Sequence, residues 1–337
     1  MEFMTGGRAE VRITPADVGK RVSVRRRTDA GEGQWAFTDA VGVLTSWNNG
    51  VLSITRRDGG TVRVEEASLV AAKVVPAQPA RRRGPAADVR ELTEVAARGW
   101  PAIETERLGG WLLRASGGFT RRANAALPLG DPGLPLDEAL ARTTRWYGER
   151  GLPARIVVTT GRPDTGEELD GELARRGWRT EAPTRVRTAA LAPLADTGAD
   201  TTPVRLTREP DAAWLGLYHR VGGPPGPEVH QVLTGGPSVW FATVTGADGA
   251  PEAIGRCVID GRWAGFAAIE VAPELRRRGL ATVVMAALAE RALDEGASAA
   301  HLQVEADNDT AHALYDRLGF TDHHGYHYRL APQGGAR

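Results

Sequence analysis

Apolar and polar residues alternate along the first part of the chain, from Val11 to about Val75. The segment VGVLTSWNNGVLSITRRDGGTVRVEEASLV shows this alternation around the pairs Asn49-Gly50 and Asp58-Gly59. Alternation is typical of half-buried strands, and Asn-Gly and Asp-Gly pairs favour the tight turns of hairpins. We therefore expect residues 10–75 to form a small antiparallel β-barrel.

Two stretches without periodicity predict domain boundaries. PAQPARRRGPAAD, residues 76–88, is rich in proline, alanine and arginine, which is typical of an exposed linker. A second such stretch, APLADTGADTTP, covers residues 192–203. A chain of 337 residues has room for more than one domain. The pattern predicts the barrel over 10–75, a linker over 76–88, and two larger domains over 89–192 and 203–332.

The segments on either side of the second linker resemble each other. Residues 151–191 and 296–330 each read as a strand and then a helix that stops at a glycine, Gly177 or Gly319. An aromatic residue follows each glycine, and another strand begins soon afterwards. A repeat at this distance predicts two copies of one α/β unit.

An apolar strand turns into an apolar helix in the second copy. WAGFAAIEVAP, residues 263–273, reads as a strand ended by proline, and from Leu280 onward the apolar residues follow helical spacing until Gly296. The arginine-rich turn Arg276–Gly279 therefore lies at a helix N-terminus. Unpaired N–H groups and the helix dipole favour an anion there, and glycine lets a phosphate approach the backbone closely.

Two motifs in this region resemble the GNAT acetyltransferase superfamily. The chain has neither the Gly-Lys-Ser/Thr of a Walker loop nor the further glycines of a Rossmann turn. Arg276-x-x-Gly279-x-Ala281 is similar to the GNAT pyrophosphate loop. Downstream, VEADNDTAHALYDRLGF resembles the GNAT signature Asn-x-x-Ala-x-x-Leu-Tyr-x-x-x-Gly-Phe, with matches at Asn308, Ala311, Leu314, Tyr315, Gly319 and Phe320. The resemblance covers residues 204–330.

The resemblance implies an α/β fold of the GNAT type, duplicated in tandem, and an N-acetyltransferase that uses acetyl-CoA as acyl donor. By the same resemblance, the strand at Ile269 to Val271 offers backbone N–H groups to the thioester and pantetheine, and Tyr315 protonates the departing thiolate. The implied acetyl-CoA contacts are Ile269, Val271, Arg276, Arg277, Arg278, Gly279, Leu280, Ala281, Thr282, Asn308, Ala311 and Tyr315.

The general base stays open at this point. Direct attack on a thioester needs a neutral amine, an oxyanion stabilised by backbone N–H groups and an acid near the sulfur. Many relatives carry glutamate five residues before the signature asparagine, where this chain has Gln303. Gln303 cannot accept the proton, so Glu270 and Glu305 are the candidate bases, and an exposed salt bridge is the alternative for either.

The first copy resembles a GNAT unit without its acetyl-CoA site. Leu173 stands where the second copy has Tyr315, and no arginines precede the first copy's helix. We expect one acetyl-CoA per chain, in the second copy. A barrel ahead of a tandem pair resembles a bacterial histone-acetyltransferase-like group whose N-terminal barrel is similar to a Src-homology-3 domain. In the first copy, Arg121, Arg122 and Asn124 either face the other half's cleft and hold a substrate carboxylate or lie exposed on a hairpin.

Composition adds few constraints. Lys plus Arg and Asp plus Glu both number 42, so net charge does not favour nucleic acid or membranes. The single Cys257 excludes an internal disulfide, and with no apolar leader or long apolar run this predicts a cytoplasmic protein. We expect no metal, although His323, His324 and His327 lie close together in sequence. The acceptor amine and the oligomeric state stay open.

Two other functions remain as alternatives to an acetyltransferase. One is a nucleic-acid-binding adaptor that uses the barrel and the run Arg81–Arg83, and the other is a CoA-binding sensor without catalysis. The barrel carries no acid–base pair, so we expect it to bind a protein partner or to pack on the catalytic half.

Overall fold

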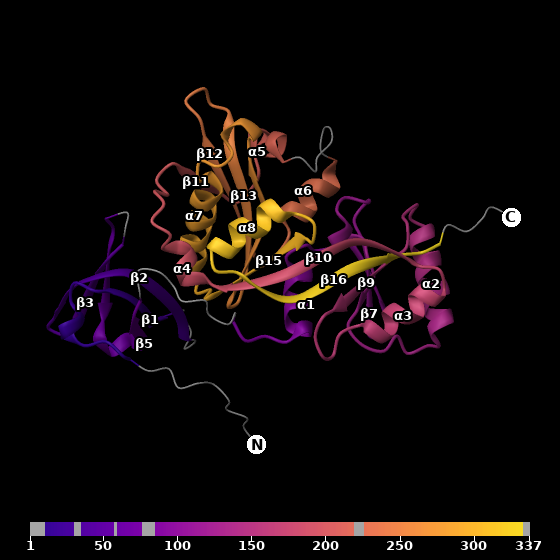
Figure 1. Ribbon diagram of the computed structural model, residues 1–337, viewed down its shortest axis with the longest axis horizontal. Coiled ribbons are helices and arrows are strands. Elements are labelled where there is room, and N and C mark those ends of the chain that lie inside the picture. Colours follow the sequence, from indigo (N-terminus) through magenta and orange to yellow (C-terminus); the bar gives the residue numbers. More distant parts are fainter. Residues whose placement is uncertain (1–10, 30–34, 57–58, 76–84, 219–225, 333–337) are drawn as a thin grey trace, which may run out of the picture.

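The computed structural model describes residues 11–29, 35–56, 59–75, 85–218 and 226–332. The run Arg81–Arg83 and most of the expected first linker lie outside the described residues. Five strands form a sheet in the order β4-β3-β2-β1-β5 at one end of the molecule (Figure 1). These strands are β1 (Arg21–Asp29), β2 (Trp35–Asn48), β3 (Val51–Thr55), β4 (Thr61–Glu65) and β5 (Leu69–Val74).

This small antiparallel unit has its own core, as the alternation predicted. Every second residue of β3 is buried, with Leu52 and Ile54 fully enclosed. Asn49 and Gly50 both have positive φ, 52° and 75°, which is the conformation that the tight β2–β3 hairpin requires. The small all-β unit expected from the sequence is therefore confirmed.

The β-unit packs on the last part of the chain through β2. Strand β2 contacts helices α7 (Leu280–Asp294) and α4 (Leu191–Ala195), which lie beside it in Figure 1. Thr38 Oγ1 donates to the backbone oxygen of Leu293 at 3.1 Å, and Arg56 pairs with Asp294 at 3.2 Å. These contacts lie at the C-terminal end of α7, opposite the arginine-rich turn that precedes the helix.

One sheet of eight strands runs through both larger halves of the chain. Its order is β11-β12-β13-β14-β15-β10-β16-β9, and a smaller sheet β6-β7-β8 lies in the first half. The first-half strands are β6 (Glu104–Leu108), β7 (Trp111–Ala115), β8 (Leu127–Pro128), β9 (Arg155–Thr160) and β10 (Arg179–Ala190). The second-half strands are β11 (Val204–Thr207), β12 (Ser238–Thr245), β13 (Pro251–Asp260), β14 (Trp263–Val271), β15 (Ala299–Glu305) and β16 (Thr321–Leu330).

The two halves exchange their last strands. Strand β10, from the first half, pairs with β15 of the second, while β16 pairs with β9 of the first. Thr184 of β10 lies opposite Tyr326 of β16, and each stands seven residues after the glycine of its own repeat. An approximate twofold axis therefore passes between β10 and β16, and neither half completes its sheet alone.

Equivalent helices end in the same way in both halves, which supports the repeat. Helix α3 (Glu167–Arg175) is followed by Gly177 and α8 (Asp309–Arg317) by Gly319, with φ of 77° and 85°. The aromatic residue after each glycine is buried, and its N–H donates to a carbonyl of the preceding helix. The remaining helices are α1 (Val89–Arg98), α2 (Leu136–Gly148), α5 (Ala212–Leu217) and α6 (Pro227–Thr234).

The prediction of a second linker over residues 192–203 is wrong at its start, where the chain is helical. Helix α4 begins there and packs on α7, because Leu191 and Leu194 are spaced to face one side and are both fully buried.

Cys257 is buried in the same core, and burial raises the pKa of its thiol, which argues against a nucleophile. In the part of the chain that the structure describes, we find no helix whose length and apolarity would let it span a membrane.

Candidate active site

Strands β14 and β15 run parallel and then separate. Their pairing begins at Trp263 and Ala299 and ends at Phe266 and Leu302, so the last part of each strand has no partner in the other. A β-bulge in β14 coincides with the parting: Gly255 of β13 lies opposite both Ala268 and Ile269, and Ala268 has a φ of 52°. A bulge bends the strand that carries it, so this one turns the end of β14 away from β15.

The separated end of β14 directs backbone groups into the gap. The N–H of Ala272 donates to Glu252 O on the β13 side at 2.9 Å. Because successive residues of a strand point their backbone groups to opposite edges, the groups of Ile269 and Val271 face away from β13, toward β15. Ile269 therefore presents a backbone donor and an acceptor along one side of the gap, and Val271 presents its N–H, as expected for a chain-like ligand. The Val271 oxygen accepts from Arg276 Nε at 3.4 Å.

The arginine-rich turn lies beyond the end of β14 and opens helix α7. Gly279 is the N-cap, with φ of 85°, and Arg277 has φ of 64°. A Cβ on Gly279 would meet nothing within 4 Å, so the space above this backbone is open. Arg276, Arg277 and Arg278 are exposed around it. An exposed helix N-terminus with three cations is a suitable anion site.

A cavity of about 160 Å³ occupies the gap between the separated strands. It brings together part of the predicted site: Ile269, Glu270, Glu305, Asn308, Ala311 and Tyr315. The other predicted acetyl-CoA contacts do not line it: Val271, Arg276, Arg277, Arg278, Gly279, Leu280, Ala281 and Thr282. Most of this second set forms the exposed turn and the start of α7, as expected if the two sets hold different parts of one extended ligand.

Tyr315 and Asn308 enter the cavity from helix α8. Asn308 is the N-cap, and its side-chain oxygen accepts from the N–H of Ala311 at 3.1 Å. Tyr315 is half-buried against Phe320, with ring centroids 5.7 Å apart. Burial raises the pKa of Tyr315 to about 12, although the charges of Arg187 and Arg122 oppose the shift. The Tyr315 hydroxyl therefore keeps its proton at neutral pH.

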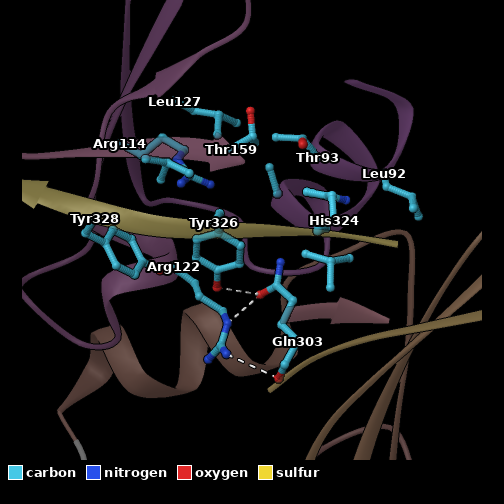
Figure 2. Close-up of a pocket in the computed structure, with 14 residues that line it drawn as sticks. Leu92, Thr93, Arg114, Arg122, Leu127, Thr159, Gln303, His324, Tyr326 and Tyr328 are labelled. Atoms are coloured by element: carbon cyan, nitrogen blue, oxygen red, sulfur yellow. Dashed lines mark hydrogen bonds between the residues drawn. The ribbon is translucent and has the colours of Figure 1, made fainter. Parts of the chain in front are cut away.

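Arg122 crosses from the first half into this cavity. It stands on the 3₁₀ turn Arg121–Ala123, and its Nε donates to the side-chain oxygen of Gln303 on β15 (Figure 2). The Tyr326 hydroxyl donates to the same oxygen at 3.3 Å. The sequence left open whether the polar side chains of the first half face the other half's cleft or lie exposed on a hairpin, and Arg122 faces the cleft of the second half. Asn124 does not, because its side chain is used to hold the preceding loop.

Three further residues of the cavity wall were not anticipated from the sequence. Trp100 follows helix α1, and the guanidinium carbons of Arg256 and Arg122 lie 4.7 and 5.7 Å from its ring centre. Arg256 is buried and donates to the backbone oxygens of Gly99, Val232, Leu233 and Gly235. A lone tryptophan and a lone arginine carry no motif, so no pattern in the sequence marks them.

His301 is the third unanticipated residue. It lies on β15, is buried, and has no hydrogen-bond partner for Nδ1 among the described residues. Burial lowers the pKa of His301 to about 4, so the ring is neutral at pH 7. The ring fits against Gly265, where a Cβ would lie only 2.6 Å from His301 Nε2.

The histidines of β16 do not gather into one site. His323 and His324 face each other, with their Nδ1 atoms 2.8 Å apart, while His327 pairs with Asp170 at 2.6 Å. The described residues contain no group of three or more His, Cys, Asp or Glu side chains placed to hold a metal ion.

The first half lacks the corresponding features. Helix α2 carries Asp137 and Glu138 in its first turn, where α7 has no acidic residue. Carboxylates at that position repel an anion from the helix N-terminus. Leu173, at the position equivalent to Tyr315, is fully buried in the first half's core. Both features support one acyl-donor site per chain.

Comparison with known proteins identifies both parts of the chain. The model of the probable histone acetyltransferase Rv0428c C-terminal family matches residues 86–329, and that of the Rv0428c N-terminal Sm-like domain matches residues 16–73. The probable histone acetyltransferase Rv0428c of Mycobacterium tuberculosis is 32% identical over 317 residues, covering 94% of this chain and 95% of the relative. The uncharacterized N-acetyltransferase YobR of Bacillus subtilis is 28% identical over 250 residues, covering 72% and 98%.

Solved structures agree with the fold. A GCN5-related N-acetyltransferase from Kribbella flavida matches with a TM-score of 0.54 at 16% identity, over 73% of this chain and 96% of that one. A tandem GNAT protein from the clavulanic acid biosynthesis pathway gives a TM-score of 0.51, also at 16% identity, over 77% and 91%. At these identities the likeness concerns the fold, which is that of a tandem GNAT protein.

Proposed function

The chain belongs to the Rv0428c family of probable histone acetyltransferases and is an acyltransferase of the GNAT type, and we propose that it moves the acetyl group of acetyl-CoA to a primary amine. The reaction takes place in the cavity between β14 and β15 of the second half. The acceptor is a small molecule, an amino acid or a protein lysine. The parting of the two strands at the Ala268 bulge is the observation that carries this proposal.

The gap and the turn fit the two ends of acetyl-CoA. The pantetheine arm is an extended chain with amide groups, and the outward-facing backbone of Ile269 and Val271 offers it strand-like hydrogen bonds. The pyrophosphate fits the open backbone at Gly279, where the helix dipole and three arginines stabilise its charge. This arrangement leads the thioester into the cavity that Tyr315 lines.

The transfer is a direct attack. The amine nitrogen forms a bond to the thioester carbonyl carbon, and the carbon–sulfur bond then breaks with its electron pair leaving on sulfur. The Tyr315 hydroxyl donates a hydrogen bond toward that sulfur, and the nitrogen loses one proton to a base. The thiolate takes up one proton from solvent, so the products are an amide and the CoA thiol. Glu270 and Glu305 line the cavity and are the candidate bases, whereas Gln303 is fixed by Arg122 and cannot accept a proton.

The test is thiol release from acetyl-CoA in the presence of a panel of amines, with mass spectrometry of the acceptor. The panel contains free amino acids, their carboxamides, polyamines and lysine-containing peptides. We expect at least one amine to stimulate thiol release and to gain one acetyl group. Tight CoA binding without release from any amine would refute the proposal and favour a CoA-binding sensor.

A further inference from the structure

We infer that the acceptor carries a carboxylate close to its amine and that Arg122, supplied by the first half, binds that carboxylate. The inference rests on the proposed function and names the class of its acceptor as small amino acids or similar zwitterions. It also gives the first half a part in the reaction, which is to place one cation in the cleft of the second.

Arg122 retains donors that its protein contacts do not use. Its Nε donates to the side chain of Gln303, and one Nη2 bond reaches Gln303 O at a long 3.4 Å. Among the described residues it forms no ion pair, so no carboxylate of that part of the chain neutralises it. A guanidinium has five N–H donors in a planar fork that matches a carboxylate.

Arg256 differs from Arg122 because its donors are used to hold the fold, whereas Arg122 has donors available for a ligand. Arg256 lines the same cavity, but its Nε and both terminal nitrogens donate to four backbone oxygens at the ends of α1 and α6. Arg256 therefore holds two helices in place. Its charge also adds to the positive potential around Trp100, since no carboxylate pairs with it among the described residues.

Gln303 explains why the charge of Arg122 is retained. A glutamate at this position of β15 would accept the same hydrogen bond and cancel the charge of Arg122. The neutral amide orients the guanidinium through its oxygen, and the Tyr326 hydroxyl holds that oxygen from the other side (Figure 2). Glutamine in place of glutamate at position 303 thus removes one candidate base and leaves the cation of Arg122 free to bind an anion.

The charges around the cavity suit a zwitterion. Its charged lining consists of Arg122 and Arg256 and the carboxylates Glu270 and Glu305. The ring of His301, which also lines it, is neutral at pH 7. A lining that contains both arginine and carboxylate side chains matches an acceptor with one anionic and one amino group. Because both kinds of side chain line one cavity, the carboxylate and the amine of the acceptor should lie close together.

Arg122 also borders a second cavity that opens beside the first. This cavity, of about 320 Å³, is lined by Arg121, Arg122, Glu305 and Tyr326, among others, so it adjoins the wall where the guanidinium lies. It gives the side chain of a carboxylate-bearing acceptor a place to extend once its carboxylate is on Arg122.

The experiment compares free amino acids with their carboxamides, which lack the negative charge, as acceptors of the full-length wild type and Arg122→Gln. The readouts are the acceptor KM, kcat and the KM for acetyl-CoA. Arg107→Gln is the matched control, since Arg107 is an exposed arginine of β6 in the same half and forms no side-chain hydrogen bond or ion pair among the described residues. Thermal unfolding of each variant checks that it is folded.

We expect the wild type to prefer at least one acid over its amide by about tenfold or more in kcat/KM. Arg122→Gln should lose this preference by raising the KM for the acid much more than the KM for the amide, with the KM for acetyl-CoA nearly unchanged. Arg107→Gln should behave as wild type. Equal loss with acids and amides would overturn the inference and assign Arg122 a positioning role through Gln303.

The outcomes also separate this inference from the proposed function. If carboxamides, polyamines or peptides release thiol but no acid is preferred to its amide, the acetyltransferase stands and the carboxylate site is wrong. If no amine of any kind releases thiol, the proposed function fails and the inference fails with it. A preference for acids that Arg122→Gln retains would place the carboxylate elsewhere.

Discussion

Replacing Tyr315 with phenylalanine removes one hydroxyl and keeps the ring that packs against Phe320. The pKa of Tyr315, about 12, lies well above the value of about 8.5 for a thiol, so complete proton transfer to the thiolate is uphill. The hydroxyl therefore acts mainly as a hydrogen-bond donor to sulfur as negative charge develops there. A hydrogen bond to a charged group contributes about 1.5–3 kcal/mol, which corresponds to a loss of about 10-fold to 150-fold in kcat.

The assay is steady-state thiol release with the best acceptor, at several values between pH 6 and 9. Because the hydroxyl keeps its proton throughout this range, the ratio of wild-type to Tyr315→Phe kcat should not change with pH. Acetyl-CoA affinity, measured by calorimetry, should change little. A variant that retains most of its kcat under conditions where chemistry limits turnover would refute the role of Tyr315 as a hydrogen-bond donor to the sulfur.

Four further predictions follow from named contacts. Gly279→Val, which forces a strained φ and fills the open space above the turn, should weaken acetyl-CoA binding by calorimetry at least tenfold more than Arg291→Ala; equal affinities would contradict the pyrophosphate site. The same titration of the wild type should give one acetyl-CoA per chain, and a value near two would contradict the silent first half. Gly265→Ala should lower the free energy of unfolding by about 1–3 kcal/mol, because the added Cβ meets His301. Gly148→Ala is the control, since a Cβ there meets nothing within 4 Å. Similar Tm values for the two variants would be inconsistent with this packing. The pKa of His301 is about 4 in the folded chain, so the free energy of unfolding should fall by about 3 kcal/mol as pH falls from about 6.5 toward 4. His301→Gln should reduce this pH dependence in thermal unfolding. An unchanged dependence of Tm on pH would assign the loss to other groups.

Local patterns were sufficient for the elements and for placing together the residues of the proposed acyl-donor site. The helix over Leu280–Asp294 and the strand over Trp263–Val271 follow from apolar periodicity, and the positive φ of Gly279 and Gly319 explains why glycine stands there. Six predicted residues line one cavity. Asn308, Ala311 and Tyr315 belong to the signature motif, and Ile269, Glu270 and Glu305 lie near the ends of β14 and β15.

The exchange of β10 and β16 could not be predicted from the sequence. A strand pattern records which residues are buried and does not record which neighbour covers them, so either pairing fits the same alternation. The proposed acceptor side of the site depends on this exchange. Arg122 and Trp100 reach Gln303 and Arg256 only because the halves share one sheet, and residues that meet through tertiary structure leave no local motif.

The central claim is that acetyl-CoA binds between β14 and β15 with its pyrophosphate on the Gly279 turn. A crystal structure of the full chain with bound acetyl-CoA tests it most directly. We expect one molecule per chain, with the pantetheine hydrogen-bonded to the backbone of Ile269 and Val271 and the sulfur near the Tyr315 hydroxyl. Acetyl-CoA bound in the first half, or bound with its pyrophosphate away from Gly279, would contradict the account.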